Sequence, residues 1–222
     1  MLASDFVSLA IAFLYVAALI ALAEILRRVF CVPVDITRKI VHIGVGMGAL
    51  VITSFFRTWF IAIIGPLVFI VVNWVSYRAN IFHGIETGER RQFGTIFFPL
   101  SFVILVPSLW SRPTVLAASF MPLTWGDAAA AILGQRFGSH RFTLFGQASS
   151  VEGSLAMFAA SFVATCFALL AFGQPIATSA LISTAVALPA TFAEALSPMG
   201  IDNLTVPLIS ALTLFALSGF LK

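Results

Sequence analysis

The sequence predicts an all-α integral membrane protein, with residues 1–222 forming one transmembrane domain of about eight helices. Of its 222 residues, 60% are hydrophobic and only 9% are Asp, Glu, Lys or Arg, whereas an average soluble domain is about 25% charged. The mean hydropathy is +1.07. A soluble protein of this size could not cover its surface with so few charged side chains, so this composition excludes the soluble classes.

The positions of the helices follow from the length that a membrane requires. Crossing an apolar core of about 30 Å takes about 20 mostly apolar residues. Stretches of this kind follow one another along the chain, separated by short polar gaps. We expect transmembrane helices at residues 6–26, 40–56, 59–77, 93–109, 114–133, 151–172, 176–196 and 204–221. Asp5 stands where a signal peptide would carry positive charge, so the first stretch is not expected to be a cleaved signal.

The distribution of basic residues predicts the orientation, because Lys and Arg concentrate in cytoplasmic loops. Nine of the 12 lie in the first, third and fifth gaps, and the other three are Arg57, Arg112 and Lys222. We therefore expect the odd-numbered gaps to be cytoplasmic and both termini to lie outside. The absence of a transit peptide before the first helix favours a bacterial inner membrane. All of the acidic residues except Asp5 lie on or near the same cytoplasmic face, which topology alone does not require.

Two groups of basic residues on this face can bind phosphate. Arg38 and Lys39 lie four and three residues before His42, so all three share a helix face and can bind phosphate oxygens and transfer a proton. The alternative is an interfacial anchor capped by Asp35. The glycines that follow are expected to serve helix packing: Gly44, Gly46 and Gly48. A second phosphate-binding pair precedes the fourth helix, or else belongs to an ordinary cytoplasmic loop: Arg90 and Arg91.

The acidic residues suggest a divalent cation. Asp127 lies within an apolar stretch, and the small residues around it, including Gly126, leave room for a hydrated cation carried by phosphates. The alternative is close helix packing with Asp127 paired to an Arg. Glu152 fits a capping box with Ser149, which by spacing alone explains it completely. Glu194 follows a long apolar run. Asp202, beside Asn203, begins the last helix and could be only its N-cap. Converging carboxylates and cations are what phosphoryl transfer from a metal–nucleotide complex needs.

Five short motifs resemble the polyprenol kinases, a family that includes phytol kinase, dolichol kinase and CTP-dependent diacylglycerol kinase. They span residues 38–207 and occur in the family's order: Arg38-Lys39-Ile-Val-His42, Gly94-Thr95-Ile-Phe-Phe-Pro99, Gly126-Asp127-Ala-Ala-Ala, Val151-Glu152-Gly153-Ser154 and Glu194…Asp202-Asn203-Leu-Thr-Val-Pro207. The compact length and the second motif are most similar to the phytol kinase branch.

The resemblance implies a membrane kinase that transfers the γ-phosphate of a nucleoside triphosphate, typically CTP, to a long-chain lipid alcohol with Mg²⁺. On this interpretation Asp127, Glu194 and Asp202 handle metal and phosphate, and His42 or a carboxylate such as Glu152 accepts the alcohol proton. Phosphate and nucleotide would be bound by the remaining motif residues and neighbouring arginines: Arg38, Lys39, Arg90, Arg91, Gly126 and Asn203. Family members commonly carry a Lys just before the Glu-Gly-Ser element, where this chain has Gln147-Ala148-Ser149-Ser150. Arg136 or Arg141 could supply the missing phosphate contact.

Other functions fit parts of the pattern. A CTP:phosphatidate cytidylyltransferase would also use Mg²⁺ and CTP at a cytoplasmic acidic face, and a diacylglycerol kinase would differ only in its acceptor. A small transporter would place charges near the bilayer midplane and break helices in matching halves, which the sequence does not favour. Expected partners are the lipid alcohol, the nucleotide and membrane lipids, without nucleic acid. Whether the chain forms an oligomer is left open.

Overall fold

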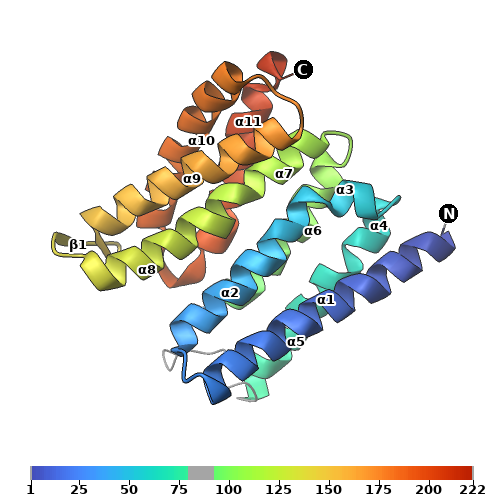
Figure 1. Ribbon diagram of the computed structural model, residues 1–222, viewed down its shortest axis with the longest axis horizontal. Coiled ribbons are helices and arrows are strands. Elements are labelled where there is room, and N and C mark those ends of the chain that lie inside the picture. The colour runs from blue at the N-terminus through green and yellow to red at the C-terminus, as the bar shows by residue number, and fades with distance from the viewer. Residues whose placement is uncertain (1, 80–92, 222) are drawn as a thin grey trace.

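The computed structural model describes residues 2–79 and 93–221, which are almost entirely helical (Figure 1). Short helical turns join the main helices at Gly48–Leu50 (η1), Pro122–Gly126 (η2) and Pro198–Gly200 (η3), and another follows the last helix at Ser218–Phe220 (η4). The main helices are α1 (Leu2–Val29), α2 (Val34–Met47), α3 (Ile52–Phe55), α4 (Trp59–Ala62), α5 (Ile64–Ala79), α6 (Gly94–Leu109), α7 (Pro113–Met121), α8 (Asp127–Phe137), α9 (Val151–Ala171), α10 (Ile176–Leu196) and α11 (Asp202–Ala216).

Each expected range overlaps one or more of these helices. Within the described ranges, four stretches are long and apolar enough to cross a membrane: Ala3–Val29, Pro113–Phe137, Val151–Ala171 and Ile176–Leu196. Shorter apolar helices lie at Trp59–Val75, Gly94–Leu109 and Asp202–Ala216. The helical, membrane-type class is therefore confirmed, while the number of spans stays a prediction.

The sequence did not predict one small element. Strands β1 (Arg141–Leu144) and β2 (Gln147–Ser150) form an antiparallel hairpin between α8 and α9. At its turn, Phe145 and Gly146 have φ of 49° and 82°. A two-residue turn with both φ values positive matches the right-handed twist of a hairpin. The Phe-Gly pair between two short polar runs was the available sequence signal, and a non-glycine residue at its first position weakens it.

The core of the bundle is the stretch from α7 through η2 to α8, which lies between α2 and α9 in Figure 1. Of its most apolar window, 78% is buried within the protein. Phe120 on α7 stacks on Phe102 of α6 with ring centroids 4.0 Å apart, and Leu116 and Val106 beside them are fully buried. Close packing of this kind contributes most of the stability of such a bundle and fixes the α7–α8 stretch in place.

Helix α1 lies on the outside of the bundle beside α2 and α5 (Figure 1). None of its most apolar window is buried within the protein, as expected for a helix that faces lipid. Hydrogen bonds from Ser8 and Tyr15 help to fix it to the bundle. Ser8 Oγ donates to the carbonyl of Phe55 at 2.7 Å, and Tyr15 Oη donates to the carbonyl of Gly44 at 2.9 Å. Gly44 has no side chain to hold α1 away, since an added Cβ would lie 2.6 Å from Leu19.

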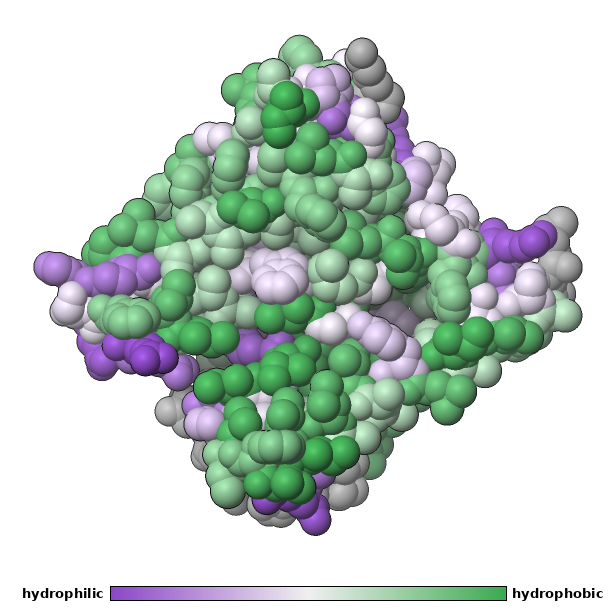
Figure 2. Space-filling view, in the orientation of Figure 1, coloured by the Kyte–Doolittle hydropathy of each residue, from purple (hydrophilic) through white to green (hydrophobic). Residues whose placement is uncertain are grey.

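Hydrophilic side chains gather at opposite ends of the molecule, and a mostly hydrophobic band separates them (Figure 2). At the N-terminal end, Asp5 accepts hydrogen bonds from the backbone N–H of Arg57 at 2.8 Å and from Thr58 Oγ1 at 2.6 Å. At the other end, Glu24 forms ion pairs with Arg27 and Arg28. This arrangement is what a membrane-embedded bundle with two aqueous faces needs.

Candidate active site

Asp127 owes its position to a break in a long apolar helix. Between α7 and α8 the chain forms a π-helical turn, Pro122–Gly126, and the backbone N–H of Asp127 bonds to the carbonyl of Pro122. The backbone nitrogen of proline cannot donate a hydrogen bond, and π-helical turns are frequent at functional sites. The turn places a carboxylate inside a membrane-length stretch, with only 11% of its side chain exposed. The sequence analysis identified Asp127 but not this turn.

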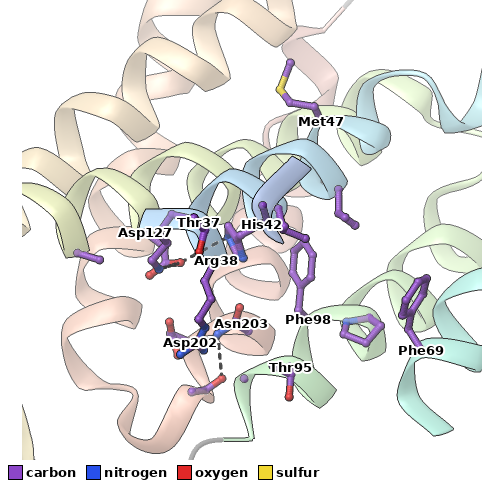
Figure 3. A pocket seen from close by; sticks show the side chains of 18 of the residues that line it. Thr37, Arg38, His42, Met47, Phe69, Thr95, Phe98, Asp127, Asp202 and Asn203 are labelled. Carbon is purple, nitrogen blue, oxygen red and sulfur yellow. Dashed lines mark hydrogen bonds and ion pairs between the residues drawn. The ribbon is translucent and has the colours of Figure 1, made fainter. Parts of the chain in front are cut away.

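The partners of Asp127 come from one face of α2. Nζ of Lys39 lies 2.7 Å from Oδ2 of Asp127. Nε2 of His42 lies 3.4 Å from the same oxygen, and Figure 3 shows His42 beside Asp127. The expected Lys39–His42 face is therefore present, but the alternative pairing of Asp127 with an Arg is wrong, because its partner is a lysine.

Helix α2 approaches η2 closely at Gly46, where an added Cβ would lie 2.2 Å from Thr124 Oγ1. Gly46 and Gly44 thus serve packing as expected, whereas Gly48 faces open space.

The proton on His42 can be placed from its hydrogen bond. Nε2 lies 2.9 Å from the carbonyl oxygen of Leu123, which can only accept, so Nε2 carries a proton and Nδ1 is the ring nitrogen able to accept one. The imidazole also stacks on Phe98, with ring centroids 4.6 Å apart. His42 therefore has charged groups on one side and an aromatic wall on the other.

A tight loop brings a second pair of polar residues to the same place. Met199 and Gly200 between α10 and α11 have φ of 57° and 82°, and the backbone N–H of Phe93 bonds to the carbonyl of Met199 at 3.1 Å. An added Cβ on Gly200 would lie 2.5 Å from the backbone nitrogen of Gly94, so glycine is required there on two counts. The start of α6 thereby packs on the start of α11.

Asp202 and Asn203 follow this loop. Nδ2 of Asn203 donates to the carbonyl of Gly200 at 3.3 Å and lies 3.4 Å from Oδ1 of Asp202. In Figure 3 the side chain of Arg38 extends from α2 toward both residues. Asp202 is the first residue of α11, whose N-cap is Ile201, so the alternative interpretation of Asp202 as an N-cap is wrong. Asp35 is likewise inside α2, whose N-cap is Pro33.

Glu194 completes the acidic group from the last turn of α10. Glu194 and Asp202 both lie close enough to Asp127 and Lys39 to interact with their charges. Within residues 2–79 and 93–221, no Lys, Arg or His lies within ion-pair distance of Glu194 or Asp202. Asp127 thus has a nearby cation, and the two other carboxylates are left to bind something else.

The charged and polar side chains described above line a cavity of about 1630 Å³: Arg38, Lys39, His42, Asp127, Glu194, Asp202 and Asn203. Its polar end holds Asp127, Glu194, Asp202 and the basic residues of α2, and the remainder is lined mainly by apolar residues of α1, α2, α5 and α6. Of the predicted site residues, the cavity brings together Arg38, Lys39, His42, Asp127, Glu194, Asp202 and Asn203.

Four predicted site residues are placed elsewhere or are not described. Glu152 does not line the cavity. Its carboxylate accepts from Ser139 Oγ at 2.5 Å and lies 2.7 Å from Nδ1 of His140. Gly126 packs against α9, where an added Cβ would lie 2.2 Å from Ser161 Oγ. The remaining two lie outside the described residues: Arg90 and Arg91.

The N-cap of α9 lies one residue later than expected, and it is a simple cap without the reciprocal bond of a capping box. The N-cap is Ser150, whose Oγ accepts from the backbone N–H of Gly153 at 3.0 Å, and Ser149 pairs with Phe142 in the hairpin. The prediction of a Ser149–Glu152 box was wrong because it did not include the hairpin that extends to Ser150.

Two arginines were expected to replace the missing Lys, and both line the cavity: Arg136 and Arg141. Neither forms an ion pair with another described residue.

The donor set fits a cation that arrives with phosphates. Among the described residues, no three His, Cys, Asp or Glu side chains are close enough to form a preformed metal cage. Mg²⁺ rarely uses such a cage, because it keeps several waters and takes one or two carboxylates plus substrate phosphate oxygens. Carboxylates facing one cavity together with cations are therefore compatible with Mg²⁺ carried by a nucleotide.

The fold and the site together define a helical, membrane-type protein with a charged cavity that continues into an apolar one. A phytol kinase of a Synechocystis species is 37% identical over 219 residues, covering 95% of this chain and 91% of that protein. The chain therefore belongs to the polyprenol and phytol kinase family.

Two plant proteins are more distant relatives. One from Triticum aestivum, described as "Probable phytol kinase, chloroplastic", is 28% identical over 94% of this chain and 74% of its own length. A chloroplastic farnesol kinase of Arabidopsis thaliana is 26% identical over 81% of this chain and 64% of its own length. No family model matches the chain, and no solved structure matches it.

Proposed function

We propose that this protein is a membrane prenol kinase, which transfers the γ-phosphate of a nucleoside triphosphate to the hydroxyl of a long-chain isoprenoid alcohol. The observation that carries the proposal is the cavity, whose charged end meets its apolar part at His42 and Phe98. A lipid alcohol needs such a boundary, because its hydroxyl must reach a water-borne nucleotide while its tail stays in an apolar environment. The relatives named phytol kinase and farnesol kinase support this acceptor class.

The charged groups of the cavity have complementary roles in this reaction. Arg38 and Lys39 bind and neutralise the triphosphate, because phosphoryl transfer depends mostly on positioning and charge stabilisation. Glu194 and Asp202, which have no cationic side chain within ion-pair distance among the described residues, would hold the divalent cation, while Asp127 stays paired with Lys39. When bound, Mg²⁺ would supply charge neutralisation to the β- and γ-phosphate oxygens.

Lys39 has a specific role because of its ion pair. Its ammonium has three donors, and one lies 2.7 Å from Asp127, so it can keep this contact while it donates to a phosphate oxygen. Lys39 thereby orients Asp127 before the nucleotide binds and stabilises the transferred phosphoryl group afterwards.

His42 is suited to the acceptor side. Its Nδ1 can take the proton of the lipid hydroxyl, and the bond from Nε2 to Leu123 fixes the ring. The O–H bond breaks as the new O–P bond forms, and the nucleoside diphosphate leaves with the electrons of the broken P–O bond. Asp127 lies 3.4 Å from Nε2 and stabilises the imidazolium that results.

For the phosphate donor we propose CTP, with Mg²⁺, on the motif resemblance. Arg136 and Arg141 at the cavity edge take the place of the Lys that this chain lacks before Glu152. We also propose that the polar end of the cavity faces the cytoplasm, since nine of the 12 basic residues belong to gaps on that side.

The proposal is tested with purified protein in liposomes, Mg²⁺ and γ-labelled CTP or ATP. The acceptors are phytol, geranylgeraniol, a long polyprenol and diacylglycerol, and Asp127→Asn is the control. Label in a prenol that disappears in the variant supports the proposal, and the better donor identifies the nucleotide. Label in diacylglycerol alone, or release of pyrophosphate with formation of a CDP-lipid from added phosphatidate, would overturn it in favour of those activities.

A further inference from the structure

The apolar part of the cavity has a regular wall. Helix α1 lines it mainly with one face, through residues three or four apart: Leu9, Ala12, Phe13, Val16, Ile20, Ala23 and Glu24. Ile11 and Tyr15 of α1 also line the cavity. On α6 the lining extends from Gly94 at the polar end to Phe102. Phe13 and Phe69 face each other across α1 and α5 with ring centroids 6.3 Å apart. The wall therefore forms a channel that runs along the helices.

The channel ends at a contact between α1 and α3. Leu9, Ile52, Phe55 and Phe56 line it there, where Phe56 is 5% exposed and Phe55 is 38% exposed. Ser8 of α1 donates a hydrogen bond to the carbonyl of Phe55 at 2.7 Å. A chain that lies along the channel from its charged end therefore meets this contact before it reaches the opposite face.

The length of the channel can be estimated from α1. Leu9 and Glu24 are 15 residues apart and Leu9 and Ile20 are 11 apart, which at ~1.5 Å per residue is about 22 Å and about 16 Å. An extended carbon chain advances ~1.3 Å per carbon, given bonds of ~1.5 Å. The channel therefore accommodates a main chain of roughly twelve to seventeen carbons.

We propose that this channel, here called the tail channel, holds the acceptor's isoprenoid tail and limits its length. This inference rests on the proposed function and specifies its substrate. Alcohols whose tails fill the channel bury the most apolar surface and are the best substrates. Polyprenols much longer than the channel meet the contact between α1 and α3 at its end and are poor substrates.

Larger side chains can be introduced into the tail channel at two glycines without clashing with neighbouring atoms. Gly48 on η1 and Gly65 on α5 both line it, and an added Cβ at either would meet nothing within 4 Å. Neither has a positive φ, so a larger side chain is compatible with the backbone. Gly219 on η4 also has open space around it but lies outside the cavity, so it provides the matched control.

The first experiment measures kcat/KM for a series of prenyl alcohols of increasing length, with wild type, Gly48→Leu, Gly65→Leu and Gly219→Leu. In wild type we expect a maximum at intermediate length. Each channel variant should lower kcat/KM for the longer of the accepted alcohols by about tenfold. This is the loss expected when roughly two methylene groups of the tail can no longer be buried in the channel. The shortest alcohol and the Gly219→Leu variant should be unaffected. Equal loss for all lengths, or no loss, would overturn the tail channel while leaving the kinase function intact.

A binding experiment separates this inference from the proposed function. A prenyl alcohol with a photoreactive diazirine at its tail end is cross-linked to wild-type protein without nucleotide, and the labelled peptides are identified by mass spectrometry. Label on peptides that contain Phe55 or Phe56, removed by excess phytol, supports the tail channel even if no kinase activity is found. Label confined to lipid-facing residues of α9 and α10 would overturn it.

Discussion

Nζ of Lys39 and Oδ2 of Asp127 lie 2.7 Å apart although 88 residues separate them in the chain. This ion pair joins α2 to the π-helical break in the α7–α8 stretch and lies at the polar end of the cavity. Both side chains are largely buried, with 23% and 11% exposed. Breaking a buried pair leaves an uncompensated charge, so the pair couples the fold to the site.

Asp127→Asn should reduce both activity and stability. The substitution leaves the Lys39 ammonium without its carboxylate, and losing one partner of a buried pair typically costs about 3–5 kcal/mol. The double variant Lys39→Met with Asp127→Asn should recover most of that stability, since both charges are gone, yet remain inactive. Thermal unfolding in detergent and initial rates of lipid phosphorylation measure the two effects. Recovery of activity in the double variant would contradict the role assigned to these groups.

Glu194→Gln and Glu152→Gln provide a matched comparison of two glutamates at helix ends. Glu194 lines the cavity, whereas Glu152 is held by Ser139 and His140 outside it. Glu194→Gln should lower kcat at least about tenfold more than Glu152→Gln, because the cation that Glu194 holds stabilises transition-state charge, and loss of such stabilisation typically costs about 10²–10³ in rate. Initial rates at saturating donor and acceptor decide this. Equal losses would contradict the specific role assigned to Glu194.

His42→Gln should lower kcat while leaving KM for the lipid nearly unchanged. The amide can keep a hydrogen bond to Leu123 but cannot accept a proton, and general-base groups typically contribute about 10²–10⁴ in rate. Phe98→Ala should instead raise KM for the lipid, because Phe98 supplies apolar wall and stacking for the ring. The contrast is read from kcat and KM measured separately. A rise in KM without a change in kcat for His42→Gln would contradict proton transfer by His42.

Gly200→Ala should destabilise the protein more than Gly173→Ala. Both glycines have positive φ, 82° and 78°, so both substitutions carry the cost of that conformation, about 1 kcal/mol. Only at Gly200 does the added Cβ also meet backbone, at 2.5 Å from the nitrogen of Gly94. The difference in unfolding free energy, measured in mixed micelles with increasing denaturant, reports the close approach of α6 to the α10–α11 loop. Equal destabilisation would mean that this approach relaxes easily.

The sequence predicted more of the site than of the local structure that forms it. Charge distribution predicted that most of the ionisable groups gather at one face, because such groups are costly within the membrane. Helical spacing placed Lys39 and His42 on one side of α2. Neither kind of reasoning could identify Lys39 as the partner of Asp127, since that choice depends on how α2 packs against η2 through Gly46.

The missed features share a physical cause. The π-helical turn before Asp127 depends on packing around Pro122, and the hairpin depends on a two-residue turn with an unusual Phe at positive φ. The shifted cap follows from the hairpin, since extension of β2 to Ser150 makes that residue the N-cap. Such features involve few residues and no periodic pattern, so composition and periodicity do not detect them.

The most direct test of the account measures the initial rate at which phytol phosphate appears in proteoliposomes, by mass spectrometry, with CTP and Mg²⁺. Wild type and Asp202→Asn are compared after equal thermal unfolding temperatures have been established for both. We expect phytol phosphate from wild type and at least about a hundredfold lower rate from the variant, because loss of a carboxylate that holds the cation removes the cation's stabilisation of phosphoryl charge. A variant that makes phytol phosphate at the wild-type rate would contradict the claim that the acidic end of this cavity performs the transfer.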